Sequence, residues 1–312
     1  MALPRIVITL GDPSGVGPEI VLKALTARQA RKSCKIIVVG DKRLLTIRKG
    51  VFSFPTTFVD VPVTDNDIDA IRPGIVSAAG GRAAYTWLCA AVKMISRGDA
   101  DALVTAPLSK EALHLAGCRY PGHTELLAAL TGTKNVAMMM ASGSLWSVMM
   151  TRHVPLKKVS SLLCVQDIVH TTQLSYDFLR NHAHLNKPRI VMCALNPHAG
   201  EAGLLGKEES TIMSPAIKAL RSAGIAVAGP VPADTAWRCA REGLWDLIVT
   251  MYHDQTMIPL KIIAPEKIVN ITVGLPFIRT SPGHGTAFDI AGKNCADPRS
   301  MIEAIGVAAS LT

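Results

Sequence analysis

The chain of 312 residues is poor in aromatic side chains, which make up 4% of it, and poorer in acidic than in basic ones. Its 33 Lys and Arg against 24 Asp and Glu give a formal net charge of +9. The basic residues are dispersed, and no basic run has the interleaved aromatic residues of a nucleic-acid groove. Nucleic acid is therefore not an expected partner. A solvated surface explains most of the charge, and attraction of small anionic substrates is the alternative.

No pair of cysteines forms a CxxC motif, and the seven cysteines are odd in number and mostly lie in apolar segments. We expect buried thiols in a reducing cytoplasm. The N-terminal apolar run, residues 6–10, is too short for a signal peptide. The most membrane-like segment, residues 136–151, is broken by Ser142-Gly143-Ser144, so two strands joined by a turn are expected there. The sequence thus predicts a soluble, cytoplasmic protein that does not enter a membrane.

Continuous apolar runs alternate with helical patterns along the chain, and no repeat or obvious linker divides it. The irregular stretch is residues 51–80, and a helical pattern with an apolar face covers residues 81–98. Such alternation predicts an α/β fold with a largely parallel sheet. Strands are expected at residues 5–10, 35–40, 145–151, 189–195 and 247–251.

Three of the expected strands run into a histidine within one to three residues, namely His153, His198 and His253. Ligands of parallel sheets bind beyond the carboxyl ends of the strands, so these side chains are expected to lie together. Neutral imidazole is the commonest nitrogen ligand of divalent metals, although a lone histidine after a strand is usually a loop residue. The intervals of 45 and 55 residues are no local metal motif, so the pattern is a hypothesis of a shared metal site.

Other polar residues have two possible roles each. Gly122, His123 and Thr124 precede a helical pattern, where free N–H groups suit an anion, but a Thr-Glu pair is more often a capping group. Asp234 is either a helix N-cap or a site carboxylate. The loop at residues 11–19 lacks the spacing of a nucleotide-binding glycine motif, so its glycines are equally well turn residues.

The stretch with the most candidate binding residues is residues 246–289. It contains Lys261, Asn270 and Arg279 at short intervals and then a glycine-flanked histidine, His284. A helix is expected to begin at Thr286. Guanidinium and amide groups suit a phosphate, since the first gives a charge-assisted fork and the second adds a neutral donor. For Arg279 the alternative is a surface ion pair.

Eight stretches together resemble the 4-hydroxythreonine-4-phosphate dehydrogenase (PdxA) family over nearly the whole chain. They are ITLGDPSGVGPEI, YPGHTE, TRHVPL, NPHAGEAG, GPVPADT, MYHDQ, VNITVGLPFIRTS and HGTAFDIAGK. The resemblance implies a homodimer with a two-lobed α/β/α fold like that of isocitrate and isopropylmalate dehydrogenases. The lobes would be roughly residues 1–130 plus 280–312, and residues 131–279, with the active-site cleft between them.

The resemblance also implies roles for residues of this chain. The metal ligands fall on His153, His198 and His253. Substrate-binding positions fall on His123, Thr124, Lys261, Asn270 and Arg279, and positions near the adenosine end of NAD or NADP on His284, Gly285, Thr286 and Asp289. The catalytic candidates are Lys261, Asp254 and Asp234. Asp297 stands where the wider dehydrogenase group usually has asparagine, which leaves the choice between NAD and NADP open.

The activity implied is oxidation and decarboxylation of 4-phosphohydroxy-L-threonine to 3-amino-2-oxopropyl phosphate, in pyridoxal phosphate biosynthesis, with NAD or NADP and one divalent metal ion. The metal would lower the pKa of the substrate hydroxyl. Histidine ligands suit zinc, cobalt, nickel or manganese, and magnesium less well. Lys261 would be a phosphate or carboxylate clamp or a general acid or base, and Asp254 would orient a ligand.

Several alternatives stay open. A sister enzyme would act on 4-phospho-D-threonate or 4-phospho-D-erythronate, and residues 105–117 look somewhat like that branch. A relative that oxidises a terephthalate dihydrodiol is disfavoured by the YPGHTE motif, Asn270 and Arg279. A metal-dependent phosphoesterase, or a binding protein without turnover, would not need the HGTAFDIAGK loop.

Overall fold

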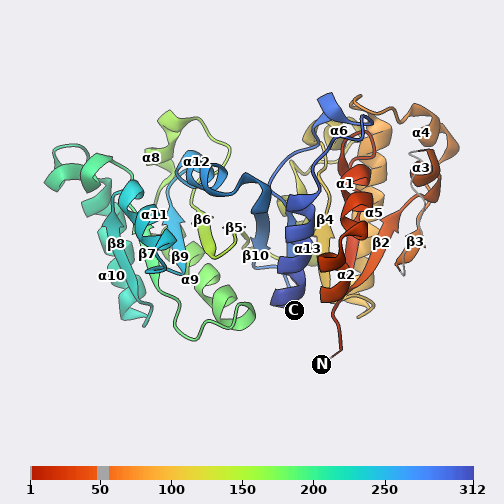
Figure 1. Ribbon diagram of the computed structural model, residues 1–312. Helices are drawn as coiled ribbons and strands as arrows, with labels where there is room; N and C mark the ends of the chain where they lie inside the picture. The colour runs from red at the N-terminus through yellow and green to blue at the C-terminus, as the bar shows by residue number, and fades with distance from the viewer. Residues whose placement is uncertain (1, 48–55) are drawn as a thin grey trace. The chain divides into compact units, whose positions relative to one another are not determined.

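The computed structural model describes residues 2–47 and 56–312, and the chain forms two compact units (Figure 1). Unit 1 contains Met1–Asn135 and Val269–Thr312, and unit 2 contains Val136–Ile268. Within the described ranges, no helix has the length and apolar character that crossing a membrane requires. Each unit consists of strands covered by helices, which confirms the predicted α/β class.

Unit 1 is built on a mostly parallel sheet with strand order β3-β2-β1-β4-β11-β10. Only β10 runs antiparallel to its neighbour β11. The central side chains Ile6, Val7 and Ile8 of β1 are all fully buried, so both faces of this sheet are covered. The strands are β1 (Arg5–Thr9), β2 (Lys35–Gly40), β3 (Thr57–Asp60), β4 (Ala102–Thr105), β10 (Ile268–Val273) and β11 (Ile278–Pro282).

Helix α5 (Ala78–Ser96) packs on β1, β2 and β4, while α13 (Arg299–Leu311) packs on β11, β4 and β1. Local capping sets where several helices begin: the Ser77 hydroxyl accepts from Gly80 N at the start of α5, and Thr64 and Ser109 cap two shorter helices in the same way. The other helices of unit 1 are α1 (Gly17–Thr26), α2 (Arg28–Ser33), α3 (Lys42–Ile47), α4 (Asp65–Ala70), α6 (Lys110–Leu115) and α7 (His123–Thr131).

Unit 2 has strand order β5-β6-β9-β7-β8. The first two strands form an antiparallel hairpin, which confirms the two strands and turn expected in residues 136–151. The remaining neighbours pair in parallel. The strands are β5 (Ala137–Ser142), β6 (Leu145–Met149), β7 (Ile190–Cys193), β8 (Val227–Val231) and β9 (Leu247–Thr250).

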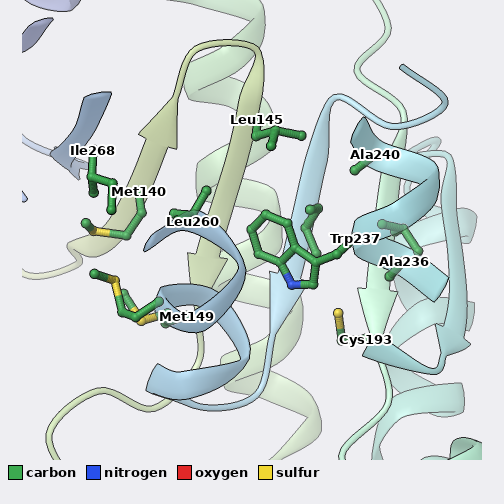
Figure 2. Packing of buried hydrophobic residues seen from close by; sticks show 12 residues of the cluster. Met140, Leu145, Met149, Cys193, Ala236, Trp237, Ala240, Leu260 and Ile268 are labelled. Carbon is green, nitrogen blue, oxygen red and sulfur yellow. The ribbon is translucent and has the colours of Figure 1, made fainter. Parts of the chain in front are cut away.

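The core of unit 2 lies where α11 and α12 pack on β6, β7 and β9, around Trp237 (Figure 2). Figure 2 shows the Trp237 indole pointing toward Leu260 of α12. Trp237 Nε1 donates to the Gln255 carbonyl at 2.7 Å, so this buried ring also fixes the first turn of α12. The helices are α8 (Val159–Leu162), α9 (Val165–His182), α10 (Ser214–Ser222), α11 (Ala233–Arg241) and α12 (His253–Ile263).

Three expectations need correction. Residues 51–55 lie outside the described residues, and residues 56–80 are irregular only in part, since they contain β3, α4 and the start of α5. No helix begins at Thr286: only a short 3₁₀ turn, Phe288–Ile290, precedes α13. The cysteines are unpaired thiols, but only Cys34 and Cys193 are buried, and Cys164 and Cys295 are exposed.

Candidate active site

The three histidines singled out by the sequence follow neighbouring parallel strands of unit 2. His153 follows β6, His253 follows β9 and His198 follows β7, and these strands lie side by side in the order β6-β9-β7. The topology thus places all three after the carboxyl ends of adjacent strands, as predicted. The rings of His153 and His253 are 5.7 Å apart between centroids, at an interplanar angle of 44°.

His198 lies in an unusual turn. Five successive residues, from His198 to Ala202, have positive φ between 42° and 81°, and only Gly200 among them is a glycine. A left-handed conformation costs a residue with a Cβ roughly 1–2 kcal/mol. Such strain persists only where the surroundings hold the backbone in place, and it concentrates at functional sites.

The described ranges contain no group of three or more His, Cys, Asp or Glu side chains close enough together to hold a metal ion. The structure therefore brings His153 and His253 together but does not complete a three-ligand set with His198. The donor chemistry of the pair still fits a divalent metal. Asp254 Oδ1 lies 2.7 Å from His253 Nδ1, which leaves Nε2 of that ring for coordination.

Buried polar contacts brace the strand ends that carry these histidines. Thr151 Oγ1 donates to the Met251 carbonyl at 2.7 Å and so joins the segments before His153 and His253. Gln255 accepts from Met251 N and donates to the Ala194 carbonyl, both at 2.8 Å. Thr151 and Gln255 could not be identified from the sequence, because their contacts join different strands and leave no local sequence pattern.

A pocket of about 310 Å³ opens beside this histidine pair. Its wall contains both rings together with a cation, a carboxylate and apolar side chains. The lining residues are Arg152, His153, Val154, Leu156, Val159, Tyr252, His253 and Asp254. Unit 2 therefore offers a small cavity of mixed polar and apolar lining at the two imidazoles.

Arg279 of unit 1 is buried, and it has no acidic partner among the residues that the structure describes. It is 1% exposed, and its guanidinium donates to Thr272 Oγ1 at 3.0 Å and to Thr105 Oγ1 at 2.6 Å. Its Nε has no hydrogen-bond partner, and neither does the buried Oδ1 of Asn270. Burial lowers the pKa of Arg279 to about 9, which still leaves it charged at neutral pH. A buried charge with only hydroxyl partners is costly, so it points to an anionic ligand rather than to the alternative surface ion pair.

His123 lies at the N-terminus of α7 and close enough to Arg279 to feel its charge. Burial, and then the Arg279 charge, hold the pKa of His123 well below 6.5, so its ring is neutral at physiological pH. Thr124, 5% exposed, follows it in the first turn. The N-cap residue is Gly122, so Thr124 is not the N-cap of this helix. His123, Thr124 and Arg279 thus offer neutral and charged donors in one unit.

The depressed pKa of His123 predicts an acid-sensitive contribution to stability. Between its folded pKa and the unfolded value near 6.5, the unfolded chain binds more protons, so stability falls as pH drops below about 6.5. The loss is at most about 1.4 kcal/mol per pH unit. Urea denaturation at about pH 7.5 and about pH 5 measures how far the free energy of unfolding falls between the two pH values. This fall should be smaller for His123→Gln than for the wild type. Equal losses would contradict the buried, neutral histidine.

The expected cofactor loop lies against the glycine loop at residues 11–19. Val16 N donates to the Thr286 carbonyl at 2.9 Å, and a Cβ at Gly15 would lie 2.8 Å from the same oxygen. Only a glycine at position 15 therefore allows the two segments to lie this close. His284, Gly285 and Asp289 are exposed, and His284 Nδ1 lies 2.9 Å from the Gly285 carbonyl. The two glycine-containing loops found separately in the sequence thus form one surface of unit 1.

Two catalytic candidates stand apart from the histidine pair. Lys261 is exposed and lies eight residues after His253 on α12, about 12 Å further along the helix axis. Asp234 is exposed in the first turn of α11, whose N-cap is Pro232, so its N-cap alternative is wrong. The structure does not bring Lys261 next to His253, and Asp234 stays a candidate site carboxylate.

Comparisons with known proteins agree with these motifs. The family model described as "Pyridoxal phosphate biosynthetic protein PdxA" matches residues 32–308. The 4-hydroxythreonine-4-phosphate dehydrogenase of Geobacter metallireducens is 42% identical, over 99% of this chain and 95% of the relative. The D-threonate 4-phosphate dehydrogenase of Cupriavidus necator is also 42% identical, over 99% of this chain and 97% of the relative.

A solved structure gives the same result. The crystal structure of 4-hydroxythreonine-4-phosphate dehydrogenase from Klebsiella pneumoniae matches this fold with a TM-score of 0.88 at 40% identity, covering 98% of each chain. The family model, the relatives and this structure all span nearly the full chain. The chain therefore belongs to the PdxA family and is a dehydrogenase of the PdxA type.

Proposed function

We propose that this protein oxidises and decarboxylates a phosphorylated hydroxy acid with NAD or NADP, and that 4-phosphohydroxy-L-threonine is its substrate. The observation that carries the proposal is the buried guanidinium of Arg279, which within residues 2–47 and 56–312 has no acidic partner and whose Nε has no hydrogen-bond partner. A phosphate or carboxylate would supply the missing negative charge. Asn270, His123 and Thr124 are proposed as the neutral groups that complete the anion site.

The proposed reaction has two stages. The C3 hydroxyl loses its proton and C3 loses a hydride, which gives a β-keto acid. Cleavage of the C1–C2 bond then releases carbon dioxide, and C2 takes up a proton to give 3-amino-2-oxopropyl phosphate. The nicotinamide coenzyme, when bound, accepts the hydride. Gly285, Thr286, His284 and Asp289, on the exposed loop described above, are proposed to bind its adenosine end.

His153, His198 and His253 are proposed to hold one divalent metal ion. When bound, this ion supplies a Lewis acid that lowers the pKa of the substrate hydroxyl. Asp254 fixes the tautomer of His253 by its contact with Nδ1, which supports a neutral ligating Nε2. Lys261 is proposed as a clamp for a substrate anion, and Asp234 as a carboxylate of the site.

D-Threonate 4-phosphate is the second candidate substrate, with a hydroxyl in place of the amino group. Relatives with the two names are equally similar to this chain, at 42% identity. The two substrates share the carboxylate, the oxidised hydroxyl and the phosphate, so Arg279 and the histidines would serve either.

The test is nicotinamide reduction by metal-loaded protein offered both compounds in parallel assays, with NAD and with NADP. We expect the larger kcat/KM with 4-phosphohydroxy-L-threonine. A larger value with D-threonate 4-phosphate would replace the first substrate by the second. Reduction with neither compound, but release of inorganic phosphate from either, would contradict the dehydrogenase proposal and favour the phosphoesterase.

We also propose that the protein is a homodimer, as the family resemblance implies. Unit 2 exposes several large apolar side chains, among them Leu156 at 70%, Ile262 at 77% and Leu204 at 83%. Exposed apolar surface of this kind is typical of protein contacts. Analytical ultracentrifugation is expected to give twice the chain mass of 33.2 kDa, and a species at the chain mass would contradict it.

A further inference from the structure

A buried carboxylate holds the segment that carries His198. Glu209 is 5% exposed and begins the π-helix Glu209–Met213. Its Oε1 accepts from Leu195 N at 3.0 Å and from Asn196 N at 2.8 Å, and its Oε2 accepts from Asn196 Nδ2 at 3.0 Å. The residues held in this way, Leu195 and Asn196, lie three and two positions before His198, where the left-handed turn begins.

The same carboxylate also touches the middle of the turn. A Cβ on Gly200, whose φ is +81°, would lie 2.7 Å from Glu209 Oε2. Glu209 therefore contacts both the backbone that leads into the turn and the glycine two residues after His198. The neighbouring Glu208 differs, because its carboxylate accepts from the side chains of Asn196 and Ser160 and from backbone N–H groups of its own segment, Lys207 and Glu208.

We propose that Glu209 is a positioning residue that holds the left-handed turn and thereby presents the His198 imidazole for metal binding. The inference rests on the proposed function, since it requires His198 to be a ligand. A carboxylate suits the position because it is an acceptor only and meets three N–H groups. In a glutamine, one oxygen would become an NH₂ group facing one of these donors.

The test measures Co²⁺ affinity by visible absorption with a competing chelator, and turnover, in the wild type, Glu209→Gln, His198→Ala and the double variant. We expect Glu209→Gln to weaken Co²⁺ binding about 10- to 100-fold, a range typical for loss of a group that orients a metal ligand. His198→Ala removes a proposed ligand and should weaken Co²⁺ binding at least as much. In the double variant the Glu209 change should add no further loss, because Glu209 acts through His198. Glu208→Gln is the matched control and should bind Co²⁺ as the wild type does.

Gly200→Ala is a second variant that retains the carboxylate but displaces it, and it should weaken Co²⁺ binding in the same way. The urea unfolding midpoint of each metal-free variant establishes that it is folded. Wild-type affinity in both Glu209→Gln and Gly200→Ala would overturn the inference, as would equal losses in Glu209→Gln and Glu208→Gln. An additive loss in the double variant would show a merely structural role and overturn it too. Unchanged affinity in His198→Ala would instead remove the proposed metal site, and the inference with it.

Discussion

Replacing Arg279 with methionine is expected to lower kcat/KM for the phosphorylated substrate about 100- to 1,000-fold, while the ligand-free protein becomes no less stable. Loss of one partner of a buried, hydrogen-bonded charge pair costs about 2–5 kcal/mol, and each 1.4 kcal/mol is tenfold. Most of the loss should appear in KM, because the guanidinium binds the anion in ground state and transition state alike.

The stability half of this prediction follows from burial. Arg279 is 1% exposed, and its guanidinium has two hydroxyl partners but no carboxylate. A packed methionine removes an uncompensated charge, and replacing buried ionic groups by apolar ones is often neutral or stabilising by about 1–4 kcal/mol. Urea denaturation of the ligand-free variant measures this change in the free energy of unfolding.

Arg5→Met is the matched control. Arg5 belongs to the same unit but pairs with Asp101 at 2.6 Å near the surface, so its loss should leave kcat/KM unchanged. A large loss of stability in Arg279→Met together with wild-type KM would make Arg279 a structural residue and contradict the anion site.

Replacing any one of His153, His198 and His253 with alanine is expected to lower metal-dependent turnover at least about 1,000-fold with the fold retained. A metal ion stabilises developing charge on the substrate oxygen by several kcal/mol, and loss of a ligand forfeits much of that. Steady-state turnover with the metal content measured in parallel checks the prediction. His170→Ala, a histidine on α9, is the control. Wild-type turnover in any of the three variants would remove that residue from the site.

The strands and the order of the histidines could be predicted because the signals are local. Buried strands of a parallel sheet are continuous apolar runs, and a histidine after such a run must lie at the carboxyl edge. The same reasoning found Arg279 as a possible anion contact. It could not find the partners of Arg279, because Thr105 is 174 residues away in the sequence.

The errors have physical causes as well. Thr286 resembles a helix N-cap, but Ala287 has φ +43° and Gly292 has φ +78°, so no helix forms before Pro298. Helix α4 was missed among prolines although Thr64 caps it and Asp65 and Asp67 lie in its first turn. Glu209 could not be identified from the sequence, because its role as an acceptor for Leu195 and Asn196 depends on contacts that form only in the folded chain.

The most direct test of the account is a product balance with metal-loaded protein and 4-phosphohydroxy-L-threonine. Reduced nicotinamide coenzyme, carbon dioxide and released inorganic phosphate are measured in the same reaction. We predict equal amounts of reduced coenzyme and carbon dioxide, with the phosphate ester intact. Phosphate release without coenzyme reduction would contradict the assignment of this site to oxidation and decarboxylation.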